Sequence, residues 1–176
     1  MRQRVLHFII LSMLSTQLFA SNNIQIGFSS NDLNSQEIKG GFYIGIDGVK
    51  KIKDNFFIGV GFNSNSFNVQ RTQTSTTLII KTSGSAYTMA WDFLLGYRLQ
   101  DILYIPLSVK AGIGYGVTHD NIINENSWNP IYSFSTLLDI YKNFGVAFRY
   151  STTTTKLLNV ENVKIKSSIV YLNIKY

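Results

Sequence analysis

The segment LYIPLSVKAGIGYGV, residues 103–117, decides the fold because its side chains change character at every second position. Its odd positions are apolar throughout: Leu103, Ile105, Leu107, Val109, Ala111, Ile113, Tyr115 and Val117. Its even positions are mostly small or polar: Tyr104, Pro106, Ser108, Lys110, Gly112, Gly114 and Gly116. Successive side chains of a β-strand point to opposite faces. The segment is therefore predicted to be a long strand with one continuously apolar face.

The same alternation recurs along the chain at strand-like spacing. It predicts seven further strands, over residues 24–29, 42–47, 56–63, 87–97, 132–140, 144–151 and 169–176. With 103–117 this makes an all-β protein of eight antiparallel strands. The glycine-rich run Gly112–Gly116 lies inside a strand with no helix after it, so it does not fit a phosphate-binding loop.

The predicted connections alternate in length. Three are tight and carry Lys, Asp or Asn, as hairpin turns do: 48–55, 98–102 and 141–143. Four are longer and polar: 31–37, 70–76, 120–130 and 152–163. Short turns on one rim and long loops on the other are typical of bacterial outer-membrane barrels, with both chain ends on the short-turn rim.

The direction of the apolar face separates two barrel classes. A soluble, lipocalin-like carrier turns its apolar face inward around a ligand, whereas a membrane barrel turns it toward lipid. Here the strand face opposite the apolar one consists mainly of Gly, Ser, Ala and Thr. These small residues fit a narrow barrel interior better than a water-facing exterior. Aromatic residues near the short turns and the C-terminus are expected to form an interfacial girdle where they face lipid: Phe56, Phe57, Tyr97, Tyr104, Tyr141, Phe144 and Tyr176. A second set is expected at the other rim: Tyr87, Tyr115, Trp128, Tyr132 and Tyr150.

Residues 1–20 are expected to be a cleaved signal peptide. Arg2 and Arg4 form a positive start, residues 5–14 are mostly apolar, and Ala20 offers a small residue at the cut. The barrel domain is then 21–176. An apolar run of this length is short for a membrane anchor, which needs about 20 residues.

Composition supports an envelope protein. Only 15% of the residues are charged, against roughly 25% in an average soluble domain, and there is no cysteine. The formal charge is +6, and 14 basic against 10 acidic residues remain once Arg2 and Arg4 are removed. No basic stripe interleaved with aromatics appears, so a nucleic-acid partner is not expected. No His/Asp/Glu set has metal-ligand spacing, so neither a metal nor another cofactor is expected.

The C-terminal segment VYLNIKY, residues 170–176, alternates apolar residues and ends on an aromatic one. With the eight-strand pattern before it, the chain resembles the small OmpA-like and OmpX-like outer-membrane β-barrels. The resemblance implies a location in the cell outer membrane of a Gram-negative bacterium. It also implies that Val170, Leu172, Ile174 and Tyr176 are the signal read by the barrel assembly machinery, although many relatives end in Phe rather than Tyr. Outer-membrane lipid and lipopolysaccharide are the expected surroundings, and a monomer is the expected state.

Five charged residues are predicted to point into the lumen: Asp47, Asp92, Lys110, Asp139 and Arg149. Buried charges must pair or cost several kcal/mol each, so Lys110 and Arg149 are expected to bridge the three aspartates. Because the bulky Tyr43, Phe57, Leu94, Leu137 and Tyr171 should share that lumen, a closed plug is favoured over a gated ion path.

An enzymatic alternative centres on His119, the only histidine after the leader, which lies beside Asp120. Lipid A deacylases and palmitoyltransferases of this scaffold use a Ser and a His near the outer rim. Here no serine has a position in the sequence that indicates a nucleophile. The sequence therefore predicts a non-catalytic, porin-like barrel with a structural, surface-interaction or narrow-pore role. A partner would bind the loops that start at Gln70 and Asp120, because barrel function usually resides in exposed loops.

Overall fold

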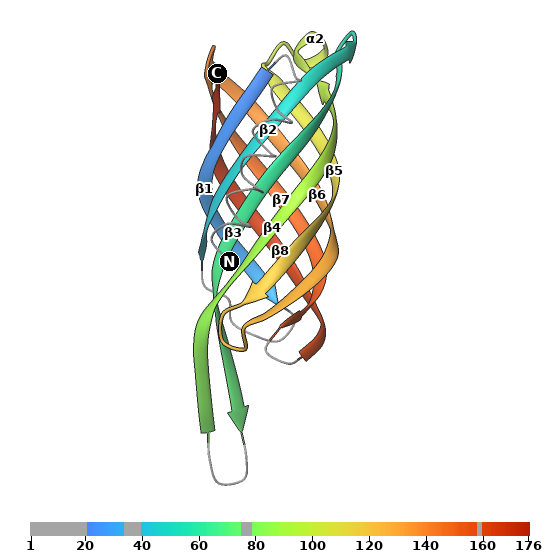
Figure 1. The fold of residues 1–176 in the computed structure, drawn as a ribbon. Coiled ribbons are helices and arrows are strands. Elements are labelled where there is room, and N and C mark those ends of the chain that lie inside the picture. The colour runs from blue at the N-terminus through green and yellow to red at the C-terminus, as the bar shows by residue number, and fades with distance from the viewer. Residues whose placement is uncertain (1–20, 34–39, 75–78, 158–159) are drawn as a thin grey trace.

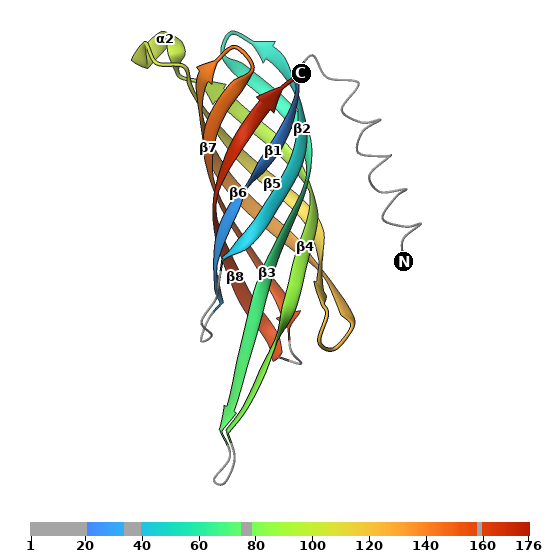
Figure 2. The ribbon, with the colours of Figure 1, turned by 90° about the vertical axis from the view of Figure 1, so that its left-hand side faces the viewer.

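The computed structural model describes residues 21–33, 40–74, 79–157 and 160–176. Eight antiparallel strands form a closed barrel in chain order (Figures 1 and 2). They are β1 (Ser21–Leu33), β2 (Gly41–Lys53), β3 (Phe56–Thr74), β4 (Ile79–Arg98), β5 (Leu107–Asp120), β6 (Glu125–Tyr141), β7 (Phe144–Leu157) and β8 (Val160–Lys175). The predicted fold class is confirmed. The expected leader, residues 1–20, lies outside the described residues.

Closure depends on the pairing of β1 with β8, from Asn23↔Lys175 to Leu33↔Ile165. Hydrocarbon offers no hydrogen-bond partner to an open strand edge, so a sheet that crosses a membrane must close. The start of β1 at Ser21 and the C-terminal residue Tyr176 lie at one rim together with the turns 54–55 and 142–143, at the top of Figure 1. We call this the turn rim, and the opposite end the loop rim.

The connection between β4 and β5 differs from the prediction. Residues 103–106 do not continue the strand, because Gln100–Leu103 form a short helix, α2, which ends at Tyr104 with a left-handed φ of 55°. Pro106 has no N–H to give to a ladder, and it restricts the residue before it to extended backbone. The strand therefore begins at Leu107, and what was expected to be a tight turn at 98–102 is an eight-residue connection over 99–106. None of the helices in the described ranges is long and apolar enough to span a membrane.

The predicted long loops are largely wrong, because most of their residues belong to strands. Residues 31–33 continue β1, 70–74 continue β3, 125–130 begin β6, and 152–157 and 160–163 complete β7 and β8. The connection between β5 and β6 is only 121–124. Hydroxyl and amide side chains made these segments look like loops, yet their backbones pair in register with their neighbours.

Two sections of the barrel differ in which face is apolar. In the section next to the turn rim, which we call the membrane section, the outward side chains are large and apolar. Along each strand, counted from the turn rim, the last large outward residue before the polar ones is Phe28, Phe42, Phe62, Tyr87, Val117, Trp128, Tyr150 or Val170. Exposed examples are Ile26, Phe93, Ile113, Phe134 and Leu172. This confirms the predicted lipid-facing exterior, which is the opposite of what a soluble carrier needs.

Beyond that level lies the outer section, where the outward residues are polar. They include Ser30, Asp32, Ser66, Asn68, Thr154, Lys164 and Ser168. Its outermost inward side chains are apolar, with Leu33, Phe67, Val69, Ala86, Leu157 and Ile165 packed into one buried cluster. At the level of this cluster the polarity of the two faces is therefore exchanged.

Aromatic residues mark both borders of the membrane section. At the turn rim Phe56, Tyr104, Tyr141, Phe144 and Tyr176 are exposed, and the ring of Phe56 packs edge-on against Tyr97 at 4.7 Å. At the other border Tyr115 stacks on Trp128 at 5.9 Å. Phe57 is the exception to the predicted girdle, because its ring is buried in the lumen.

Candidate functional site: the barrel lumen

The lumen of the membrane section is filled by side chains that cross it from opposite walls. The five bulky residues predicted to share it are all buried: Tyr43, Phe57, Leu94, Leu137 and Tyr171. Glycine makes room for them, since a Cβ on Gly96 would overlap the ring of Phe57. The interior is therefore packed, as eight strands require.

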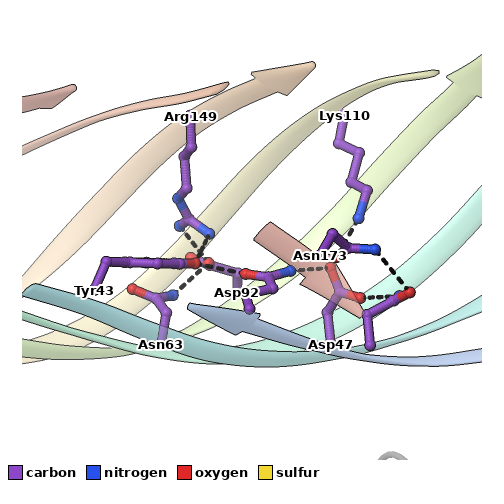
Figure 3. A network of polar contacts seen from close by, with 9 residues as sticks. Tyr43, Asp47, Asn63, Asp92, Lys110, Arg149 and Asn173 are labelled. Carbon is purple, nitrogen blue, oxygen red and sulfur yellow. Dashed lines mark hydrogen bonds and ion pairs between the residues drawn. The ribbon is translucent and has the colours of Figure 1, made fainter. Parts of the chain in front are cut away.

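One ion pair lies near the turn rim. Lys110 on β5 reaches across to Asp47 on β2, with 2.8 Å between Nζ and Oδ2. Asn23 and Gln25 on β1 also donate hydrogen bonds to the Asp47 carboxylate, the latter at 2.7 Å. Asn173 on β8 then donates to Asn23 at 3.1 Å. One buried carboxylate is thus surrounded by an ammonium group and two amides, as Figure 3 shows.

A second ion pair lies deeper in the barrel. Arg149 on β7 bonds Asp92 on β4, with 2.5 Å between NH2 and Oδ2. Asn63 on β3 donates to the same oxygen at 2.7 Å. Burial in low dielectric makes an unpaired charge expensive, so each ion has to find its partner across the lumen.

Tyr43 joins the two ion pairs into one network (Figure 3). Its hydroxyl donates to Gln25 at 2.7 Å and accepts from Arg149 NH1 at 3.4 Å. Its ring lies 5.4 Å from that of Tyr171. The result is a continuous chain of contacts from Lys110 to Asp92 in which two positive and two negative charges balance.

Asp139 does not join this network, contrary to the expectation that Lys110 and Arg149 bridge all three aspartates. Its carboxylate pairs with Lys175 on β8 at 2.7 Å, and both side chains are partly exposed at the turn rim. The physical reason is depth, since Asp139 lies next to the turn that follows β6 and a nearer cation is available there. Lys110, Asp139, Lys175 and Arg98 line a hollow of about 90 Å³ at this mouth.

Sequence reasoning missed the amides that complete the network: Asn23, Gln25, Asn63 and Asn173. The alternation placed Gln25 and Asn173 on the face opposite the apolar one. It does not show whether an amide on that face is hydrogen-bonded to a carboxylate or only occupies space. The pairing Asn23↔Asp47 is a signal that becomes visible only when the register of β1 and β2 is known.

The residues of the expected assembly signal lie at the end of β8. Val170, Leu172 and Tyr176 are exposed on the outer face, and Ile174 is half-buried beside them. The Tyr176 N–H donates to the carbonyl of Asn22 at 3.1 Å, which ties the C-terminus to β1.

His119 and Asp120 do not form the pair that the enzymatic alternative needs. As neighbours on β5 they point to opposite faces, with His119 outward. The His119 ring lies 5.0 Å from Tyr87, and its Nδ1 lies 2.8 Å from Asn126 Oδ1. The Asp120 carboxylate accepts the N–H of Ile122 at 2.8 Å. Within the described ranges, no group of three or more His, Asp or Glu residues is placed to hold a metal.

Several solved structures are similar to this chain at low sequence identity. The backbone structure of the outer-membrane protein Ail of Yersinia pestis in a phospholipid bilayer nanodisc matches with a TM-score of 0.52 and 14% identity, over 89% of this chain and 99% of that one. A de novo designed transmembrane β-barrel matches with a TM-score of 0.51 and 11% identity, over 90% and 97%. The outer-membrane protein OprG of Pseudomonas aeruginosa matches with a TM-score of 0.50 and 16% identity, over 90% and 96%.

No protein-family model matches the chain, and no curated protein matches it. The chain has the architecture of the small eight-stranded outer-membrane β-barrels. The closed backbone and the apolar belt of the membrane section require lipid around the barrel. Fold and exterior together are those of a barrel that crosses a lipid bilayer.

Proposed function

We propose that the protein is a non-catalytic outer-membrane barrel that binds a protein partner at the cell surface. The observation that carries this proposal is the hairpin of β3 and β4, which projects beyond the rest of the barrel at the bottom of Figures 1 and 2. The two strands pair with each other as far as Thr74↔Ile79. Their other neighbours stop earlier, since β2 ends against β3 at Gly41↔Phe67 and β5 ends against β4 at Ala86↔Asp120.

Residues 68–74 and 79–85 therefore form a two-stranded ribbon, which we call the outer ribbon. Among the described residues, neither outward edge of this ribbon is covered by a third strand. Unpaired N–H and C=O groups along an edge are a template for another extended chain. This element coincides with the start of the Gln70 region, where the sequence predicts partner binding. In the second predicted region, which starts at Asp120, the connection is only 121–124, and residues 125–130 belong to β6.

Photo-crosslinking on intact cells tests the ribbon. A crosslinking amino acid at Asn68 or Ser83 should give a discrete protein adduct, whereas the same amino acid at Thr154, exposed on the outward face of β7, should not. Replacing residues 70–83 by a two-residue Asn-Gly turn, which suits the Val69↔Gly84 pair, should abolish binding of that partner while the barrel still folds. Equal adducts from Asn68 and Thr154 would contradict a role for the ribbon.

The non-catalytic part of the proposal is supported by the separation of His119 from Asp120 described above. Mass spectra of lipid A from cells with the protein, without it and with His119→Ala should be identical. A change in acyl chains that depends on His119 would favour the lipid-modifying enzyme instead.

We further propose that residues 1–20 direct export and are removed. The barrel assembly machinery reads Val170, Leu172, Ile174 and Tyr176, and the folded protein is a monomer in contact with lipopolysaccharide. The charge network of Asp47, Asp92, Lys110 and Arg149 supports a closed plug over a narrow pore, because its members are buried and mutually paired. N-terminal sequencing of the membrane-extracted protein and planar-bilayer recordings test the leader and the plug.

A further inference from the structure

The apolar cluster of the outer section fills the lumen from opposite walls. Leu33 comes from β1, Phe67 and Val69 from β3, Ala86 from β4, and Leu157 and Ile165 from β7 and β8. In a ring of eight strands, β3 and β4 stand opposite β7 and β8. Ile122, from the connection between β5 and β6, packs against the same cluster, so the residues that build it come from walls on both sides of the lumen.

The connection between β5 and β6 adds a cover to the cluster. Ile122 packs against it from the 121–124 connection, and Val163 packs against it from β8. The Ile122 side chain occupies the space where a Cβ on Gly84 would lie. Each of the six cluster members on the strands is at most 2% exposed, so water does not reach them.

A polar layer lies directly beneath the cluster. Asn65 donates to Asn31 at 2.8 Å, Ser167 donates to Asn31 at 2.6 Å, and Ser29 donates to Asn65 at 2.6 Å. These side chains bond one another across β1, β3 and β8, and all four are buried. The apolar cluster therefore separates a polar interior from the cell exterior.

We propose that this cluster is a hydrophobic seal that keeps water and ions out of the lumen without help from the charge network. An ion that enters an apolar constriction loses hydration for which the lining offers no substitute, so such a constriction blocks conduction by dewetting. The seal consists of Leu33, Phe67, Val69, Ala86, Leu157 and Ile165. It lies in series with the ion pairs of the membrane section, and loss of those pairs alone leaves the lumen closed.

The absence of native cysteine permits a direct test on intact cells with a membrane-impermeant thiol reagent. Ser167→Cys puts a thiol just beneath the seal, and Ser168→Cys puts the matched thiol on the outward face of the same strand. The thiol at position 167 should react roughly a hundredfold more slowly than that at 168, because reaction requires local opening. Adding Phe67→Ala should bring the two rates together, whereas adding Lys110→Ala should not.

Two results would overturn the seal. One is a thiol at position 167 that reacts as fast as that at 168 with the cluster intact. The other is an equal acceleration by Lys110→Ala and by Phe67→Ala. If Phe67→Ala does not give a heat-modifiable folded barrel, Val69→Ala removes less volume and serves the same comparison.

Planar-bilayer recordings supply an independent readout. The native protein and Lys110→Ala should both be non-conducting. Steady current through Lys110→Ala alone would show that the apolar cluster is no barrier. The partner-binding proposal is unaffected by either result, because it rests on the backbone edges of the outer ribbon and not on the side chain of Val69, which belongs to the seal.

Discussion

The membrane section and the outer section are continuous along the same strands, yet they are built in opposite ways. The membrane section carries large apolar side chains outside and a balanced polar network inside. The outer section carries hydroxyl and amide groups outside and an apolar cluster inside. The solvent decides the difference, because lipid accepts no unpaired polar group while water favours the burial of apolar surface. One barrel thus contains an outer-membrane type of core and a soluble type of core, stacked end to end.

The largest expected loss in the free energy of unfolding comes from a substitution in the apolar cluster of the outer section. Phe67→Ala removes a buried ring and should lower the free energy of unfolding by about 3–5 kcal/mol. Phe28→Ala, at the outward border of the membrane section, should cost clearly less because its ring is 76% exposed. Denaturant titration of the protein refolded into lipid vesicles measures both. Equal losses would mean that the outer section has no core of its own.

The next effect tests the outside of the membrane section. Phe93→Arg places a cation against hydrocarbon and should cost about 2–4 kcal/mol if the site lies near the bilayer midplane. Ser66→Arg makes the same kind of change on the outward face of the outer section, where it should alter stability by no more than about 0.5 kcal/mol. Similar losses at both positions would remove the distinction between the two exteriors.

A smaller effect is expected inside the membrane section. Asp92→Asn keeps the volume but removes the charge that faces Arg149, and loss of a hydrogen bond to a charged group should cost about 1.5–3 kcal/mol. Replacing both residues, as in Asp92→Leu with Arg149→Met, should recover most of that loss, because a buried pair often contributes little over apolar residues of similar size. A double variant weaker than the single one would show that the network stabilises the barrel on balance.

The smallest effect is expected at the turn rim. Lys175→Ala breaks the pair with Asp139, whose side chains are 27% and 31% exposed, so solvent screening limits the loss to about 0–1 kcal/mol. The same titration, repeated at high salt, should show no further difference between the variant and the native protein. A loss as large as that of Asp92→Asn would place this pair in the buried network after all.

Alternation alone was sufficient to predict the membrane section. It placed Tyr43, Phe57, Leu94, Leu137 and Tyr171 in the lumen, where the structure has them. It failed in the outer section, because the expected pattern had apolar residues outside and small ones inside. Leu157 and Ile165 stand among Thr and Lys residues, and so they looked like parts of loops rather than the inward half of an inverted strand.

The partners within the lumen were harder to predict than the residues that face it. Two strands lie between Lys110 and Asp47, and two lie between Arg149 and Asp92, so these contacts depend on how far the ring is staggered. The stagger is the shift in register between neighbouring strands, summed around the closed barrel. A local sequence pattern does not predict it. For the same reason nothing in the sequence distinguished Asp139, which finds Lys175, from the two aspartates that pair with Lys110 and Arg149.

The pairing of β1 with β8 has a consequence for biogenesis. The first strand finds its second neighbour only in β8, the last strand of the barrel, so no product that lacks β8 can complete the ring. A chain that stopped before Val160 would expose the unpaired backbone edges of β1 and β7 to lipid. Such a chain would not be stable in the membrane. Ring closure thereby makes synthesis of all eight strands a condition of a stable place in the membrane.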